Sequence, residues 1–327
     1  MTLTRRTFLG AAAAASCTAA LPAFAAKPLT IGFSQVGAES EWRTANTASI
    51  KDATKRAGIN LKFADAQQQQ QNQVKAIRSF IAQRVDIIAF SPVVETGWET
   101  VLREAKNAKI PVILTDRSVK VSDPSLYVSF IGSDFVEEGR RAGKWLLDYA
   151  KKNGDKPLNI VELQGTTGAA PANDRKKGFA EAIAANPKLK VIRSQTGDFT
   201  RAKGKEVMES FIKAEGGGKN ICAVYAHNDD MMVGAIQAMK EAGLKPGKDI
   251  LTVSIDAVPD IFKAISAGEA NATVELTPNM AGPAFDAIVA FKEKGTVPPK
   301  WIQTESKLYT AADDPQKVYD SKKGLGY

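Results

Sequence analysis

Short apolar runs alternate with helix-like segments along almost the whole 327-residue chain, and this alternation constrains the fold more than any other feature. The first part of the chain has runs at residues 29–33, 59–63, 87–90, 112–114 and 126–131. The second part has runs at residues 158–163, 189–192, 223–226, 251–255 and 272–274. Strands that alternate with helices at this spacing favour parallel sheets built from β-α-β units. The sequence therefore predicts an α/β fold with two Rossmann-like lobes.

The segments between the runs carry helix signals. Apolar residues recur at spacings of three and four in two of them, at Val74, Ile77, Phe80 and Ile81 and at Trp98, Val101, Leu102 and Ala105. This spacing is typical of a helix face that packs on a sheet. Gly58 and Gly243 stand where such helices are expected to end in a left-handed cap.

The N-terminus predicts export. Arg5 and Arg6 precede an apolar, alanine-rich stretch, and small residues follow at Ala23 and Ala25. A bilayer span needs ~20 apolar residues, so this stretch is too short for a membrane anchor. We predict a twin-arginine signal peptide at residues 1–25 and a mature protein in the periplasm.

Charge and cysteine content exclude several classes of protein. The net charge of +8 falls by two when the signal peptide is removed, and the basic residues are scattered rather than gathered in a stripe. We therefore expect no nucleic-acid partner. Cys222 is the only cysteine beyond residue 25, which excludes an internal disulfide and a cysteine-based metal cluster. We expect neither a metal nor a cofactor.

Polar residues stand where several of the strand-like runs end. They are Asp116 and Arg117, Asn228, Asp256 and Glu275. In open α/β sheets the carboxyl ends of the strands meet at a crevice where ligands bind. Carboxylate, amide and guanidinium groups together supply the acceptors and donors that neighbouring sugar hydroxyls require. We interpret these residues as part of a sugar-binding site.

Trp42, Arg43 and Arg175 extend this interpretation. Trp42 and Arg43 follow the loop after the first run, and an indole face suits the apolar side of a sugar ring. Plainer roles remain open for most of the set: interface packing for Trp42, a structural ion pair for Asp116 and Arg117, helix capping for Asn228 and Asp256, and a solvated helix face for Arg175. Glu275 is harder to explain by a plain structural role, because a buried carboxylate in an apolar strand needs a partner.

A resemblance to a known family rests on motifs spread along the chain. They are Gly32-Phe33-Ser34-Gln35, Glu39-Ser40, Trp42-Arg43, Thr115-Asp116-Arg117-Ser118, residues 173–179, residues 226–230 and residues 274–278. This order resembles the ribose-type family of periplasmic sugar-binding proteins, the type I periplasmic binding proteins, and in particular its galactofuranose-binding members. The similarity covers nearly the whole mature chain.

The resemblance implies a monomeric, two-lobed receptor hinged by three chain crossings, near Gly132, near Glu275 and near residues 297–303. One lobe comprises residues 26–132 and 276–300, and the other comprises residues 133–275 and 301–327. The ligand is a monosaccharide, galactofuranose or a related furanose, delivered to the membrane permease of an ABC transporter. The implied ligand-binding residues are Glu39, Trp42, Arg43, Asp116, Arg117, Arg175, Asn228, Asp256 and Glu275.

Two positions depart from the pattern of the family. Glu41 adds a charge beside Trp42 where a small residue is usual, and Ala257 follows Asp256 where glycine is common. Both bear on the choice of sugar, so competition by pyranoses or arabinose-like sugars is left open. The local backbone angle at residue 257 is also open.

Other functions have weaker support in the sequence. His227 is the only histidine and no nucleophile motif accompanies it, so we predict that the chain is not an enzyme. Paired carboxylates such as Asp116 and Glu275 are the one arrangement that could hydrolyse a glycoside. A periplasmic sugar receptor for a sensory or chemotaxis system is the other alternative, and the sequence does not separate it from transport.

Overall fold

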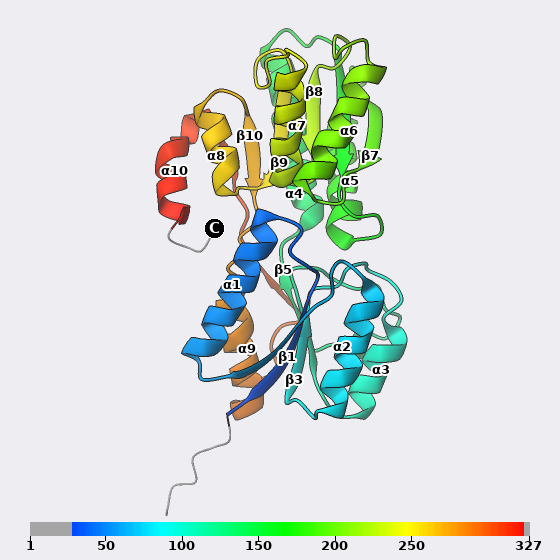
Figure 1. The fold of residues 1–327 in the computed structure, drawn as a ribbon, viewed down its shortest axis with the longest axis vertical. Coiled ribbons are helices and arrows are strands. Elements are labelled where there is room, and N and C mark those ends of the chain that lie inside the picture. Colours follow the sequence, from blue (N-terminus) through cyan, green and yellow to red (C-terminus); the bar gives the residue numbers. More distant parts are fainter. Residues whose placement is uncertain (1–27, 324–327) are drawn as a thin grey trace, which may run out of the picture.

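The computed structural model describes residues 28–323 of the chain. The predicted signal peptide therefore lies outside the described residues. Across residues 28–323, none of the helices combines the length and the apolar character that crossing a membrane requires. The chain forms two α/β lobes, one above the other (Figure 1).

The first lobe is built on a six-stranded sheet in the order β11-β5-β4-β3-β1-β2, in which every strand pair is parallel. Its strands are β1 (Thr30–Gln35), β2 (Asn60–Asp65), β3 (Ile87–Phe90), β4 (Val112–Thr115), β5 (Ser129–Gly132) and β11 (Trp301–Gln303). One face packs against α1 (Glu41–Arg56) and α9 (Ala281–Lys294), and the other packs against α2 (Gln70–Ala82) and α3 (Glu99–Asn107). A 3-10 helix, η1 (Pro124–Leu126), precedes β5.

Strand β3 is apolar throughout because helices cover both faces of this sheet. In β3, Ile87 and Ala89 contact the α1 side, while Ile88 and Phe90 contact the α2 and α3 side. Continuous apolar runs of this kind are expected for parallel strands that are buried on both faces.

The second lobe repeats the plan with a sheet in the order β12-β10-β9-β8-β6-β7. Its strands are β6 (Leu158–Gln164), β7 (Leu189–Thr196), β8 (Ala223–Ala226), β9 (Leu251–Asp256), β10 (Ala272–Glu275) and β12 (Leu308–Thr310), and only β12 is antiparallel to its neighbour. Helices α4 (Phe135–Lys152) and α5 (Ala170–Ile183) cover one face. Helices α6 (Arg201–Ala214), α7 (Asp229–Glu241) and α8 (Pro259–Ser266) cover the other. The 3-10 helix η2 (Ala311–Asp313) leads to α10 (Pro315–Lys322), which packs on α8.

The chain crosses between the lobes three times, as predicted. The crossings lie between β5 and α4, between β10 and α9, and between β11 and β12. The third lies later than the sequence-based division places it. β11 pairs with β5 in the first sheet, and the Trp301 indole donates to the carbonyl of Gly132 at 2.9 Å. The assignment of residues 301–303 to the second lobe is therefore wrong, and the first lobe extends to Gln303.

All ten predicted strands are present as β1 to β10, with small shifts at their ends. The largest shift is at β7, which continues to Thr196 rather than ending at residue 192, and β5 begins only at Ser129 rather than at residue 126. β11 and β12 were missed, because three residues are too few to show a periodic pattern. Gly58 and Gly243 follow α1 and α7 with φ of 65° and 76°, which confirms the predicted left-handed helix ends.

Candidate functional site

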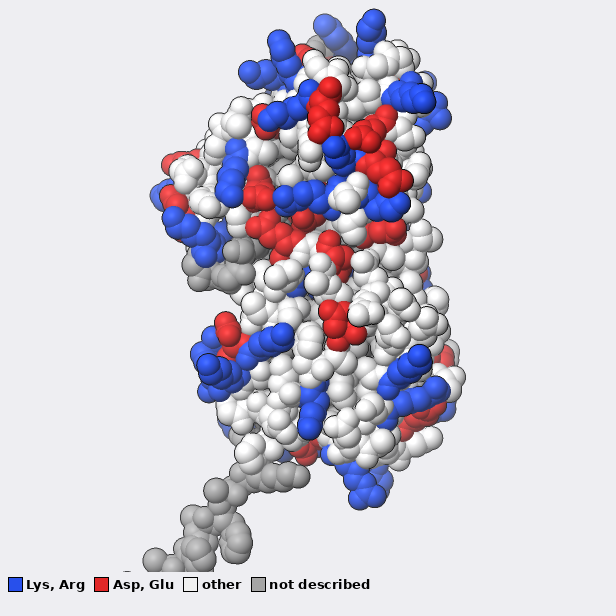
Figure 2. Space-filling view, in the orientation of Figure 1, with Lys and Arg blue, Asp and Glu red and all other residues white. Residues whose placement is uncertain are grey.

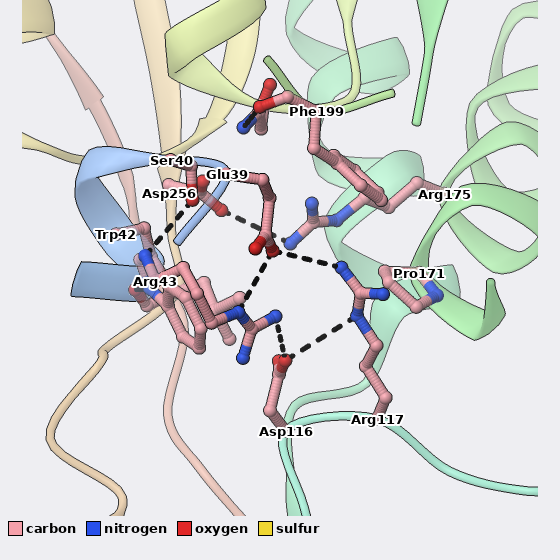
Figure 3. A pocket seen from close by; sticks show the side chains of 12 residues that line it. Glu39, Ser40, Trp42, Arg43, Asp116, Arg117, Pro171, Arg175, Phe199 and Asp256 are labelled. Atoms are coloured by element: carbon pink, nitrogen blue, oxygen red, sulfur yellow. Dashed lines mark hydrogen bonds and ion pairs between the residues drawn. The ribbon is translucent and has the colours of Figure 1, made fainter. Parts of the chain in front are cut away.

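A small cavity of about 20 Å³ lies between the lobes, at the carboxyl ends of strands from both sheets (Figure 3). This is where ligands of open α/β sheets are expected. The first lobe lines it with Glu39, Ser40, Trp42, Arg43, Asp116 and Arg117. The second lobe and the crossing after β10 contribute Pro171, Arg175, Phe199, Asn228, Asp256 and Leu276.

Arg43 is the centre of the charged network in the first lobe. The Ser40 side chain caps α1 by accepting the backbone N–H of Arg43, which fixes the start of the helix at the cavity. The Arg43 guanidinium contacts Asp116 at 2.6 Å and Glu39 at 3.0 Å. Burial disfavours this cation, but the two carboxylates outweigh burial and raise the pKa of Arg43. Burial likewise opposes ionisation of Glu39, yet Arg43 and Arg117 lower its pKa.

Arg117 follows β4 and lies across the cavity from Arg43. Its guanidinium donates to the carbonyl of Val93 at 3.1 Å and lies 3.6 Å from Glu39 and 3.7 Å from Asp116. Burial and the charge of Arg43 lower the pKa of Arg117 to about 10, so it remains a cation at neutral pH. Asp116 holds its carboxylate here from a left-handed backbone, with φ of 63°. Such strain in a non-glycine residue often marks a functional position.

Two buried polar atoms of this network have no hydrogen-bond partner among the described residues. They are the Nε of Arg117, a donor, and the Oε2 of Glu39, an acceptor. Buried polar groups are seldom left in this state, because each unmade bond costs about 1–3 kcal/mol. A ligand hydroxyl can accept from one and donate to the other.

Arg175 plays the corresponding part in the second lobe. It reaches the cavity from α5 and donates to Glu138 at 2.9 Å and to the carbonyl of His227 at 2.6 Å, with Asp256 at 3.4 Å. Burial raises the pKa of Asp256 well above its usual range, although Arg175 opposes that shift. Asn228 caps α7 through the backbone N–H of Met231 and also lines the cavity. The capping role and the site role of Asn228 are therefore compatible.

Two aromatic side chains border the cavity, and only one was predicted. Trp42 is 2% exposed, donates its indole N–H to the carbonyl of Leu276 at 2.6 Å and packs in the core of the first lobe. Phe199, from the loop between β7 and α6, lies against the Arg117 guanidinium at 5.2 Å. The sequence predicted a strand that ends at residue 192, four residues before β7 ends. The argument from strand ends therefore did not identify Phe199 as a site residue. Pro171 showed no comparable signal in the sequence.

Glu275 is the one predicted site residue that does not line the cavity. Its carboxylate accepts hydrogen bonds from Lys322 of α10 and from the Tyr309 hydroxyl of β12 at 3.1 Å. The Glu275 carboxylate therefore has structural partners, Lys322 and Tyr309. The assignment of Glu275 to the sugar-binding site is corrected. The carboxylate pair that the glycosidase alternative requires, Asp116 with Glu275, is not assembled in the cavity.

His227 also has a structural environment. It is fully buried, its Nδ1 accepts the backbone N–H of Gly165 at 3.2 Å, and its Nε2 lies 3.0 Å from Glu162. A ring nitrogen that accepts carries no proton, so the neutral ring donates from Nε2 to Glu162. Burial lowers the pKa of His227, which favours the same state. Within residues 28–323, no group of His, Cys, Asp and Glu could hold a metal ion.

Comparison with known proteins agrees with this fold and cavity. The model of the periplasmic binding protein domain family matches residues 31–291, and the chain belongs to this family. The galactofuranose-binding protein YtfQ of Escherichia coli is 63% identical over 92% of this chain and 94% of its own length. A crystal structure of a galactofuranose binding protein matches with a TM-score of 0.89 and 63% identity, covering 92% of this chain and all of that one.

A third match has a different furanose. It is the periplasmic binding protein of the arabinose ABC transporter from Shewanella sp. ANA-3, bound to α- and β-L-arabinofuranose, with a TM-score of 0.85 and 56% identity over 90% of this chain and 97% of that one. By its fold and its relatives, the chain is thus a periplasmic sugar-binding protein. The family and the relatives named here are binding proteins rather than enzymes.

Proposed function

We propose that this protein closes its two lobes on a single furanose, galactofuranose, and delivers it to the permease of an ABC transporter. It acts as a monomer in the periplasm, which it reaches by the twin-arginine route. The charged lining of the cavity is the observation that carries the proposal. It places donors and acceptors from both lobes around the same small space between them.

The ligand-binding residues of this proposal are Glu39, Trp42, Arg43, Asp116, Arg117, Arg175, Asn228 and Asp256, with Phe199 added. The unpartnered atoms of Arg117 and Glu39 support a hydroxylated ligand. The choice of a five-membered sugar ring is based on the relatives, since one is named for galactofuranose and another is bound to arabinofuranose.

Such a charged site need not bind with extreme affinity. Hydrogen bonds to charged groups contribute ~1.5–3 kcal/mol each, so a simple sum exceeds the ~8 kcal/mol of a micromolar complex. Arg43 already contacts both Asp116 and Glu39, so the sugar replaces existing ion pairs rather than empty space. Desolvation and closure of the lobes offset the rest, and we expect a dissociation constant of about 1 μM or below.

Calorimetry with the mature protein tests the proposal. D-galactose and L-arabinose equilibrate between furanose and pyranose rings in water, whereas methyl β-D-galactopyranoside is locked in the six-membered ring. We expect heat from D-galactose, no heat from the locked pyranoside, and a furanose ring in crystals of the complex. Binding of the pyranose ring, or no binding by any of these sugars, would contradict the proposed ligand.

Arg117→Ala tests the site itself. The loss of a charged donor to the hydroxyls should weaken binding at least tenfold, which corresponds to ~1.4 kcal/mol. The melting temperature of the ligand-free protein should stay close to that of the wild type, because Asp116 and Glu39 keep their contacts with Arg43. Arg78→Ala is the control, since Glu104 is the ion-pair partner of Arg78 among the described residues and both side chains are exposed. Unchanged affinity in Arg117→Ala would remove Arg117 from the site.

A further inference from the structure

A second contact between the lobes lies outside the cavity, at the start of α1. The backbone N–H of Glu41, in the first lobe, donates to the Oδ2 of Asp230 at 2.9 Å, so a carboxylate of the second lobe caps this helix. Arg201 of α6 lies 3.2 Å from Asp230, 3.0 Å from Asp260 and 3.8 Å from Glu41. Acidic side chains are gathered where the two lobes meet in Figure 2.

This group, the Glu41 cluster, has more negative than positive charge. Glu41, Asp230 and Asp260 contribute three carboxylates, and Arg201 and Lys263 contribute two cations. The cations are held mainly by the acids of the second lobe, since Lys263 contacts Asp260 at 2.9 Å. The Oε2 of Glu41 is buried and accepts no hydrogen bond from the described residues. The ionised form of Glu41 is therefore poorly accommodated.

This environment exists only when the lobes are together. Glu41 belongs to α1 of the first lobe, whereas the groups that face it belong to the second: Arg201 on α6, Asp230 on α7, and Asp260 and Lys263 on α8. Separation of the lobes returns Glu41 to water at the N-terminus of a helix, where a carboxylate is stabilised. The two arrangements thus differ in their preference for a proton on Glu41.

We propose that closure of the lobes takes up a proton at Glu41, so that the protein holds its sugar more tightly as the pH falls from weakly alkaline to weakly acidic. This inference rests on the proposed function, because the sugar is what drives closure. Protonation of Glu41 removes the third negative charge from the Glu41 cluster. Arg201 then neutralises only Asp230 and Asp260. Glu41 is then a regulatory residue of the binding equilibrium that lies outside the cavity.

The sign of the effect follows from linkage. Burial, Asp260 and Asp230 raise the pKa of Glu41 to about 7 in the closed arrangement, against an ordinary value of 4.5. The closed state therefore binds more protons than the open state between these two values. Affinity should rise as the pH falls through 7 and level off below about 4.5. Near pH 7 closure should take up about half a proton, and from about pH 8.5 to 5.5 affinity should rise about thirtyfold.

Calorimetry in two buffers of different ionisation enthalpy measures this proton uptake directly. Asp256, inside the cavity, is another group whose protonation closure can change, so the comparison with Glu41→Gln isolates Glu41. Glutamine mimics the protonated form, so the affinity of the variant should not change with pH between about 8.5 and 5.5 and its half-proton uptake should be lost. Its advantage over wild type should be largest at about pH 8.5 and about thirtyfold smaller at about pH 5.5. Asp52→Asn, an exposed change on the same helix, is the control and should behave as wild type.

The outcomes separate this inference from the proposed function. Sugar binding with equal proton uptake in wild type and Glu41→Gln would overturn the inference and leave the function intact. If no sugar binds, the function fails, and X-ray scattering of the ligand-free protein then decides the inference. Wild type should be more compact at about pH 5.5 than at about pH 8.5, and Glu41→Gln should be equally compact at both. Equal radii of wild type at both pH values would overturn it.

Discussion

The three arginines of the cavity are each held by carboxylates, and this pairing lets charge persist in a buried site. Arg43 lies between Glu39 and Asp116, and Arg175 lies between Glu138 and Asp256. A guanidinium keeps its charge and presents several donors in a rigid plane, which suits adjacent hydroxyls. Arg117 is the least well paired, with carboxylates at 3.6 and 3.7 Å and an Nε that has no acceptor among the described residues. It is therefore the arginine most available to a sugar.

Asp256 and Glu275 show how two neighbouring strand ends can place one carboxylate at the cavity and the other in a structural contact. They are paired in register at the ends of β9 and β10. Asp256 departs from extended backbone, with φ of 127°, and its side chain lines the cavity. Glu275 instead anchors α10 through Lys322.

Glu275→Gln and Asp256→Asn test this difference. Glu275→Gln should leave sugar affinity within about twofold, but should lower stability by about 1–2 kcal/mol because the partly buried pair with Lys322 is lost. Asp256→Asn should weaken binding about tenfold or more, because an amide NH2 replaces one of the carboxyl oxygens that lie beside Arg175 and the cavity. Titration calorimetry and thermal melting measure the two quantities. A similar loss of affinity in both variants would return Glu275 to the site.

At the scale of elements, the loops after the strands place the site, and glycine makes close packing between them possible. Asp198 and Phe199 both adopt left-handed backbone in the loop between β7 and α6. Gly165, directly after β6, lies beneath the Phe199 ring, and a Cβ at Gly165 would come within 1.9 Å of it. Ala257 also has a left-handed φ, 60°, so its backbone takes the angle that glycine adopts without strain.

Gly165→Ala should therefore displace Phe199 from the cavity. The added methyl group cannot fit against the ring, so the loop must move, and we expect sugar affinity to fall about tenfold. Gly282→Ala in α9 is the matched control, because a Cβ there meets nothing within 4 Å. Calorimetry and a crystal structure of the variant measure both effects. An unmoved Phe199 with reduced affinity would contradict this explanation.

At the scale of the whole molecule, the three crossings form a hinge and the lobes meet through a few specific contacts. The Glu95 backbone N–H donates to the carbonyl of Gly168 at 2.9 Å, and the Asn173 amide donates to the Glu95 carboxylate at 2.9 Å. Arg117 and Phe199 meet across the cavity, and Glu41 meets Asp230 outside it. A ligand that contacts both lobes favours the closed state by its difference in affinity for the two states.

Scattering should report this closure. The radius of gyration should decrease when saturating sugar is added, because the ligand links the lobes that the hinge otherwise lets separate. Arg117→Ala, measured at the same sugar concentration, should show a smaller decrease, in proportion to its lower occupancy. Equal radii for wild type with and without sugar would contradict a hinge mechanism.

The sequence alone predicted the strands and most of the residues that line the cavity, because both are marked by local patterns of residues. Apolar runs such as residues 87–90 reveal buried parallel strands, and the polar residue after a run, such as Asp116, lies at the cavity because strand ends converge. Only the tertiary structure decided which carboxylate faces the cavity, that Phe199 lines the cavity, and that Trp301–Gln303 belongs to the first sheet. The physical reason is that the direction of a side chain at a strand end, and the partner of a three-residue strand, depend on backbone angles and neighbours distant in the sequence, which no local pattern encodes.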